Sequence, residues 1–310
     1  MIIINCSLKT QLSRAGTKMP PWVAYLFLVI TGLTVFIVLR LKRKFIAASN
    51  LHQAVRAAER LSQEGFTPII NLLGEHYHSR EKIERTVDQY RYLIDLLAQS
   101  GIQGKISIKP TQIGLAFSKD LYHQNLIAIL RRANTHNPRI QVEIDIENAR
   151  YKHDTLGVFL EIPGEYDARQ AVQVYFYGSS EKDIEKLLRQ NRKIRLVKGA
   201  YAEGDLTPAQ VEDQMRNCSQ HLVLCARDPA IATVRDEHLL RTIIEFVTDI
   251  KTIQRDSFEI QMLYGRRDDL KRFYKAHGYR VAVYMPVGPA YKAIPYIWRR
   301  VKELIKSRFR

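Results

Sequence analysis

Short apolar runs typical of β-strands alternate with amphipathic helical runs from about residue 50 onward, and this alternation limits the possible folds more than any other feature. The runs expected to form strands are 68–72, 105–109, 140–145, 171–177, 194–199, 230–233, 258–263 and 280–284. Strands that are each followed by a helix favour a parallel sheet with helices on its outside. The chain is therefore predicted to be an α/β protein, a (β/α)8 TIM-type barrel.

Helical periodicity between these runs supports the same fold. The expected helices are 81–99, 120–133, 182–189, 208–226, 237–249, 268–277 and 295–306. An open doubly wound sheet is the alternative, and it would need a Gly-rich dinucleotide turn after its first strand. Residues 71–75 read NLLGE, which is not that turn. The segment 68–310 also has the length of a single barrel, roughly 250 residues.

An uncharged apolar stretch lies close to the N-terminus. Residues 22–39 read WVAYLFLVITGLTVFIVL, and about 20 such residues cross a bilayer core. Trp22 and Tyr25 stand where interfacial aromatic residues are common, and a basic run beginning at Arg40 follows the stretch, as after a stop-transfer segment. A single transmembrane helix at 22–41 is predicted; an uncleaved signal or a buried core helix is the alternative.

Four segments are therefore expected along the chain. They are an N-terminal tail at 1–21, the transmembrane helix at 22–41, a basic linker with a lead-in helix at 42–67, and a catalytic domain at 68–310. Lys and Arg are more numerous between residues 40 and 60 than before the span, which favours a cytoplasmic position for the large domain. The expected location is the membrane, with one pass.

The chain carries a formal net charge of +16, which suits either nucleic acid or an anionic membrane surface as a partner. Zinc-finger spacing, an RNP-like segment and a basic heptad array are all missing from the sequence. The positive charge instead gathers beside the apolar stretch and at 299–310. The lipid bilayer is therefore the expected partner, and nucleic acid is not.

Polar residues recur at the ends of the expected strands, where TIM barrels place their active sites. At these ends or inside the strands lie Lys109, Asp145, Glu147, Gln173, Arg195, Lys198, Thr233, Glu259, Gln261 and Tyr284, and Gly199 lets a ligand approach the backbone. Each has a structural alternative: Glu259 and Gln261 suit a buried polar network, and Arg195 with Asp145 suits a structural ion pair. Their coincidence at one end of one barrel favours a shared pocket.

Two adjacent arginines follow the last expected strand. Arg299 and Arg300 lie four and three residues before Glu303, so on a helix both are neighbours of that carboxylate. Paired guanidinium groups held in this way can bind a substrate carboxylate with several hydrogen bonds. A solvated basic helix end is the alternative, because the helix dipole favours cations there.

Six motifs in order resemble the proline dehydrogenase family over about residues 50–305. They are ISIKPTQIGL at 106–115, IDIE at 144–147, RLVKGAY at 195–201, FEIQMLYG at 258–265, YMPVG at 284–288 and PYIWRRVKE at 295–303. The resemblance implies a barrel that binds FAD and oxidises L-proline to Δ1-pyrroline-5-carboxylate by hydride transfer to flavin N5. It further implies that electrons pass to membrane quinone and that a separate pyrroline-5-carboxylate dehydrogenase uses the product.

The resemblance also implies roles for individual residues. Asp145 and Arg195 would be catalytic, and no metal would be needed. The residues implied to bind proline are Lys109, Leu263, Tyr284, Arg299, Arg300 and Glu303, with Lys109 paired to Asp145. The residues implied to bind FAD are Ile146, Val172, Gln173, Arg195, Lys198, Gly199, Ala200, Thr233, Val234 and Gln261.

Two stretches depart from the family pattern. Residues 232–236 read ATVRD and lack the family's His, and residues 173–178 read QVYFYG and lack the family's Arg. Both departures concern the cofactor and leave the proline clamp untouched. They keep two alternatives open: a related flavoenzyme acting on another cyclic amino acid such as hydroxyproline, and a flavin-deficient barrel with a binding role.

Overall fold

The computed structural model describes residues 40, 44–175, 180–199, 206–233, 237–250, 253–289, 291–294 and 296–298. From Lys44 onward these residues belong to one compact unit. None of the helices within the described residues is both long and apolar enough to cross a membrane. The span expected at 22–41 lies, apart from residue 40, outside that part of the chain.

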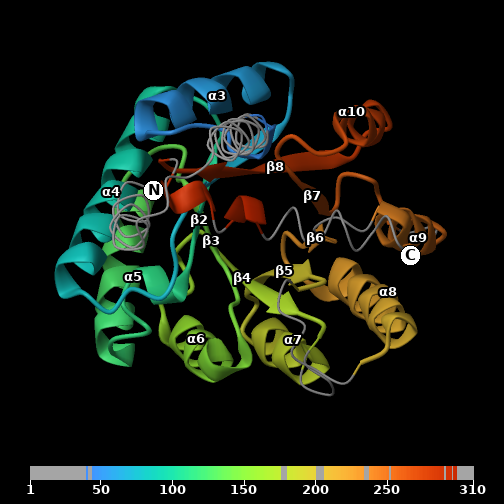
Figure 1. Cartoon of the computed structure of the whole chain (residues 1–310). Helices are drawn as coiled ribbons and strands as arrows, with labels where there is room; N and C mark the ends of the chain where they lie inside the picture. Colours follow the sequence, from blue (N-terminus) through green and yellow to red (C-terminus); the bar gives the residue numbers. More distant parts are fainter. Residues whose placement is uncertain are drawn as a thin grey trace, which may run out of the picture. The chain divides into compact units, whose positions relative to one another are not determined.

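Eight parallel strands close into a barrel in the order of the sequence, with helices around the outside (Figure 1). The strands are β1 (Thr67–Leu72), β2 (Lys105–Ile108), β3 (Gln141–Ile144), β4 (Ala168–Gln173), β5 (Lys193–Val197), β6 (Ala230–Ala232), β7 (Glu259–Leu263) and β8 (Arg280–Val287). The barrel closes where β1 meets β8, with Ile69 opposite Tyr284. The predicted (β/α)8 architecture is confirmed.

The helices are α3 (Leu51–Gln63), α4 (Arg80–Gln99), α5 (Lys119–Asn134), α6 (Ala149–Glu161), α7 (Ser180–Arg189), α8 (Pro208–Cys225), α9 (Glu237–Thr248) and α10 (Asp268–Ala276), with a short 3-10 helix η1 (Pro110–Gln112). Side chains cap several of them: Asn50 accepts from the backbone N–H of Gln53, and Thr207 forms a capping box with Gln210. The first turn of each of these helices is therefore stabilised by its own sequence.

The lead-in helix α3 packs against β1 and β8. The segment before it is also tied to the barrel, because Ala48 pairs with Val287 in an isolated parallel bridge. The backbone N–H of Ala47 donates to the carbonyl of Pro286 at 2.9 Å. Residues 44–67 thus belong to the same compact unit as the strands.

The two faces of each strand have different chemistry. Ile106, Val142, Leu196 and Ile260 point outward into the apolar core beneath the helices and are fully buried. Burying such a side chain contributes about 1.5–3 kcal/mol. The alternate residues point into the barrel, since successive strand side chains face opposite sides. Many of these inward residues are charged, and they are the ones that build the site.

Several predicted boundaries were wrong. Strand β4 was expected at 171–177 but spans Ala168–Gln173, so Arg169 lies inside it and Tyr175 follows it. Strand β8 continues to Val287, so Tyr284 lies inside the strand and does not end it. Helix α6 was missed, because Gly157 and Thr155 interrupt its apolar periodicity. Lys198 and Gly199 follow β5 and are not part of it.

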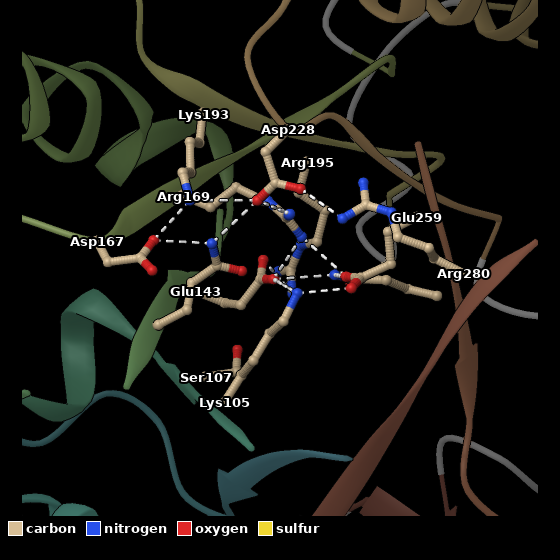
Figure 2. Close-up of polar contacts among 12 residues, drawn as sticks. Lys105, Ser107, Glu143, Asp167, Arg169, Lys193, Arg195, Asp228, Glu259 and Arg280 are labelled. Carbon is tan, nitrogen blue, oxygen red and sulfur yellow. Dashed lines mark hydrogen bonds and ion pairs between the residues drawn. The ribbon is translucent and has the colours of Figure 1, made fainter. Parts of the chain in front are cut away.

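Arg169 is the centre of a buried charge cluster inside the barrel (Figure 2). Its Nη1 donates to Glu143 Oε1 at 2.8 Å and to Glu259 Oε1 at 2.9 Å, and its Nη2 donates to Asp228 Oδ2 at 2.6 Å. Lys105 Nζ donates to Glu259 Oε2 at 2.6 Å. Burial by itself raises the pKa of Glu259, but Lys105 and Arg169 lower it to about 2. Glu259 is therefore an anion at neutral pH.

We predict that Arg169→Met lowers the free energy of unfolding by about 3–5 kcal/mol, because three carboxylates lose a fully buried cation. Arg280→Met is the matched control. Arg280 also donates to Asp228, at 2.9 Å, but its side chain is 40% exposed, so its loss should cost within about 1 kcal/mol. Urea unfolding measures the free energy of unfolding of both variants. An equal decrease in the two would contradict the central place of Arg169 in the cluster.

Candidate active site

A cavity of about 660 Å³ opens at the carboxyl ends of the strands, within the size range of small-molecule sites. Residues from most of the strands contribute to its wall, together with residues of α4 and of the segment after β8. The residues predicted from the sequence that line this cavity are Lys109, Asp145, Ile146, Gln173, Arg195, Gly199, Gln261, Leu263 and Tyr284. The shared pocket expected from the strand ends is thus present.

Asp145 accepts hydrogen bonds from four side chains that come from β2 and its end, β5 and β8. Its Oδ1 accepts from Ser107 Oγ at 2.8 Å and from Arg195 Nη2, and its Oδ2 accepts from Lys109 Nζ at 3.2 Å and Tyr284 Oη at 2.8 Å. Strand β3 ends just before Asp145, and Lys109 directly follows β2. The expected pairing of Lys109 with Asp145 is confirmed by this geometry.

The protonation states of this group follow from its contacts. Burial by itself raises the pKa of Asp145, but Lys109 and Arg195 outweigh burial and hold that pKa below its ordinary range. Burial and the nearby Asp145 carboxylate both raise the pKa of Tyr284 well above its usual value. Asp145 is therefore an anion and Tyr284 a neutral donor at pH 7. Asp145 acts by orienting its partners, since a carboxylate this acidic is a poor base.

The charge at the cavity floor favours an anionic ligand. Lys109 and Arg195 both contact the carboxylate of Asp145, and Arg195 also lies near Glu143, which is not part of the cavity wall. The other charged residues of the wall are Lys82, Arg85 and Lys292 against Glu75. A carboxylate entering the cavity would therefore meet an excess of positive charge, and Lys109 is placed to contact it while remaining paired with Asp145.

Other predicted residues lie away from the cavity wall or outside the described chain. Val172 points outward into the apolar core, because alternation along β4 places it opposite Ala171 and Gln173; its side chain is therefore not a cavity contact. Lys198 and Thr233 are described but are not part of the cavity wall. The predicted residues that lie outside the described part are Ala200, Val234, Arg299, Arg300 and Glu303.

Sequence reasoning missed several contributors. Ser107 holds Asp145 and lies two residues before Lys109, so strand alternation offered a signal for it. Glu75 and Tyr77 follow β1, and Tyr291 and Lys292 follow β8; all four line the cavity. No motif singled them out, because residues in loops and helices carry no alternation that points toward a pocket.

One group in the described residues brings possible metal ligands together. Oxygen and nitrogen atoms of Glu75, His76 and Glu147 lie within 4.8 Å of one another. Both Glu147 oxygens, however, accept from Thr111, from its backbone N–H at 2.8 Å and its hydroxyl at 2.7 Å. Glu147 therefore anchors the segment that follows β2, and the expectation that the site needs no metal stays a prediction.

The cavity wall fits a planar, acceptor-rich ring such as that of a flavin. Gln173 Nε2 and Arg195 Nε are buried donors with no hydrogen-bond partner among the described residues. Buried donors normally have a partner, so a ligand acceptor suits both. Gly199 has φ +104, and a Cβ there would lie 2.7 Å from Tyr175 Cδ2 and 2.9 Å from Gln173 Oε1. Glycine at this position lets the side chains of Tyr175 and Gln173 pack directly against the backbone.

Comparisons with known proteins agree with these features. The family model for proline dehydrogenase matches residues 54–304. Proline dehydrogenase 1 of Bacillus subtilis (strain 168) is 30% identical over 269 residues, covering 84% of this chain and 86% of that protein. The proline dehydrogenase of Deinococcus radiodurans is 32% identical over 279 residues, covering 85% of this chain and 86% of that protein.

A solved structure shares the fold. The crystal structure of proline utilization A (PutA) from Bdellovibrio bacteriovorus, inactivated by N-propargylglycine, superposes with a TM-score of 0.79 at 22% identity. The match covers 88% of this chain but 33% of that one, so the chain spans about a third of the length of that protein. At this identity the likeness supports the barrel fold alone.

We predict that Gly199→Ala reduces flavin binding, because the added methyl group would displace the side chains of Gln173 and Tyr175. Gly278→Ala is the matched control: Gly278 also has a positive φ, of +84, but a Cβ there meets nothing within 4 Å. Both variants carry backbone strain of about 1–3 kcal/mol. Absorbance of bound flavin and urea unfolding separate the effects. Equal flavin content in two equally destabilised variants would contradict the assignment.

Proposed function

The chain belongs to the proline dehydrogenase family, and on this premise we propose that it oxidises L-proline to Δ1-pyrroline-5-carboxylate with FAD as its cofactor. One observation carries the proposal. Asp145 gathers Lys109, Arg195 and Tyr284 at the floor of a cavity whose wall also holds the open donors Gln173 Nε2 and Arg195 Nε. Such a cavity suits an amino-acid carboxylate on one side and a flavin on the other.

In this proposal the substrate is held mainly by charge. Lys109 contacts the carboxylate of proline, and Arg299 and Arg300 clamp it with Glu303 keeping the two arginines in place. Leu263 and Tyr284 are register partners on β7 and β8, and both line the cavity, so they form the surface against the proline ring. Asp145 keeps Lys109 and Arg195 oriented. Held in this way, proline presents its C5 in one orientation.

The cofactor is held by residues from β3 to β7 in the same proposal. Gln173, Arg195 and Gly199 contact the ring, with Ile146 and Gln261 nearby on the cavity wall. Lys198, Ala200, Thr233 and Val234 contact the remainder of FAD. When bound, the flavin would supply the two-electron oxidation as the acceptor of the hydride lost from C5 of proline, while the ring nitrogen loses its proton. Arg195 is a fixed cation that stabilises negative charge on the reduced cofactor.

We further propose that residues 22–41 cross the membrane once, with the large domain on the cytoplasmic side. The uncharged stretch and its basic C-terminal flank support this arrangement. An anchored enzyme would pass its electrons to quinone, which dissolves in the bilayer. The product would then be oxidised by a separate pyrroline-5-carboxylate dehydrogenase.

The test of the activity uses the full chain purified in mild detergent. We expect a flavin absorption spectrum that bleaches on addition of L-proline, and proline-dependent reduction of a dye. Lys109→Met should raise the KM for proline about tenfold or more, through loss of a charged hydrogen bond, without changing the flavin content. Lys186→Met, an exposed change on α7, is the control.

Two outcomes would overturn this part of the proposal. A protein without flavin absorption, and without proline-dependent dye reduction after FAD is added, would not be a proline dehydrogenase. A protein that bleaches with hydroxyproline far more readily than with proline would be a related flavoenzyme with another substrate. Substrates are compared at equal flavin loading, so that differences in cofactor content do not enter.

The anchor has a separate test. We expect the full chain to stay with membranes after washing in high salt and at alkaline pH. Leu28→Lys combined with Val35→Lys should release it, since each lysine at the centre of a span costs about 2.5–3.5 kcal/mol. Sedimentation followed by immunoblotting measures the distribution. Full release of the unchanged chain by salt alone would indicate attachment through surface charge and would contradict a membrane span.

A further inference from the structure

Glu143 lies on β3 between two arginines inside the barrel (Figure 2). It is fully buried. Its Oε1 accepts from Arg169 Nη1 at 2.8 Å and from Gln261 Nε2 at 3.0 Å. Its Oε2 accepts no hydrogen bond among the described residues and lies 3.7 Å from Arg195 Nη1. Oε1 thus belongs to the charge cluster around Arg169, and Oε2 faces Arg195 at the cavity floor.

The guanidinium of Arg195 has carboxylates on two sides. Asp145 accepts from Nη2, and Glu143 lies beside Nη1. The ring of Tyr284 adds a third contact, with its centroid 5.9 Å from Arg195 Cζ. A single contact at Nη2 would leave the planar group free to turn about that hydrogen bond. An anion beside each Nη restricts this freedom, and Nε has no hydrogen-bond partner within the described part of the chain.

We propose that Glu143 is a positioning residue for Arg195, which fixes the orientation that the Arg195 guanidinium presents to a ligand in the cavity. This inference rests on the proposed function, in which that ligand is the flavin. Glu143 does not line the cavity and contacts neither substrate nor cofactor. It acts through Arg195 alone, by keeping the guanidinium plane in one orientation.

The other contacts of Glu143 do not explain it equally well. Arg169 keeps two further carboxylates, Glu259 and Asp228, when Glu143 is neutralised. Gln261 likewise keeps Glu259 as an acceptor, at 2.9 Å. Glu259 is therefore a close match for Glu143: both are buried, both accept from Arg169 and both accept from Gln261. The contact that distinguishes Glu143 is the one with Arg195.

Positioning and plain charge predict opposite changes in the reduction potential of the cofactor. Removing a buried negative charge near the cavity makes the reduced, more negative cofactor easier to form, which raises the potential. Misaligning Arg195 removes a cation and donor that stabilise that same negative charge, which lowers the potential. The sign of the shift therefore distinguishes the two effects.

The experiment compares Glu143→Gln, Glu259→Gln and the unchanged chain, each full length, in detergent and loaded with FAD. The potential is measured against a reference dye, and kcat and the KM for proline are measured alongside. We expect Glu143→Gln to lower the reduction equilibrium constant at least tenfold, about 30 mV for a two-electron couple. The kcat should fall while KM changes little, because Lys109 keeps its place. Glu259→Gln should leave the potential unchanged or raise it.

Glu143→Asp serves as a second variant and covers a failure of Glu143→Gln to fold. It keeps the negative charge but draws the carboxylate back from Arg195. If Glu143 positions Arg195, the reduction potential should fall. If only its charge matters, the potential should equal that of the unchanged chain. A higher reduction potential in Glu143→Gln than in the unchanged chain would overturn the inference. So would equal shifts of the potential in Glu143→Gln and Glu259→Gln. An unchanged chain that binds no flavin and ignores proline would overturn the proposed function itself, and this inference with it.

Discussion

The ion pairs of Arg169 hold together the interior of a barrel that has little apolar filling. TIM barrels are commonly filled by Val, Ile and Leu, whereas the inward positions here carry charges. Lys105, Lys109, Arg169 and Arg195 pair with Glu143, Asp145, Asp228 and Glu259, and Lys193 and Arg280 also contact Asp228. Taking charges out of water costs several kcal/mol per ion, so this interior is stable only while each charge stays paired.

This requirement also keeps the strands in register. A shift of one residue along a strand exchanges its two faces. On β2 such a shift would turn Ile106 and Ile108 inward and would place Lys105 and Ser107 in the apolar core under the helices. The pairing of charges inside and the packing of aliphatic side chains outside therefore specify the same register. The ion pairs and the aliphatic packing are different interactions, but a barrel with a shifted strand would lose both.

The candidate active site is formed by the next inward-pointing residues toward the carboxyl ends of the same strands. On β2 and just beyond it, Lys105, Ser107 and Lys109 follow one another at intervals of two residues. On β3 the corresponding series is Glu143 and then Asp145, which receives hydrogen bonds from β2, β5 and β8. The cluster around Arg169 thus supports the cavity floor from below, which is why a residue outside the cavity can affect the ligand within it.

The sequence allowed prediction of the barrel because the outward faces of its strands are mostly aliphatic. It failed at the start of β4, where Arg169 reads as a strand boundary. The partners that neutralise Arg169 lie 26, 59 and 90 residues away, and no local pattern connects them. The end of β8 was missed for a related reason, because Pro286 commonly ends strand pairing but here still faces Asn71 of β1.

Within the site, too, some residues could be predicted from local motifs and others only from contacts between distant parts of the chain. Lys109, Asp145, Arg195 and Tyr284 were predictable because motifs mark strand ends, whereas Glu143 becomes meaningful only through its distance to Arg195. The open donors that suit a flavin ring come from β4 and β5, on Gln173 and Arg195. The stretch 232–236 that departs from the pattern follows β6. In the proposed function, a change there bears on the remainder of the cofactor, whereas the donors proposed to orient the ring come from β4 and β5.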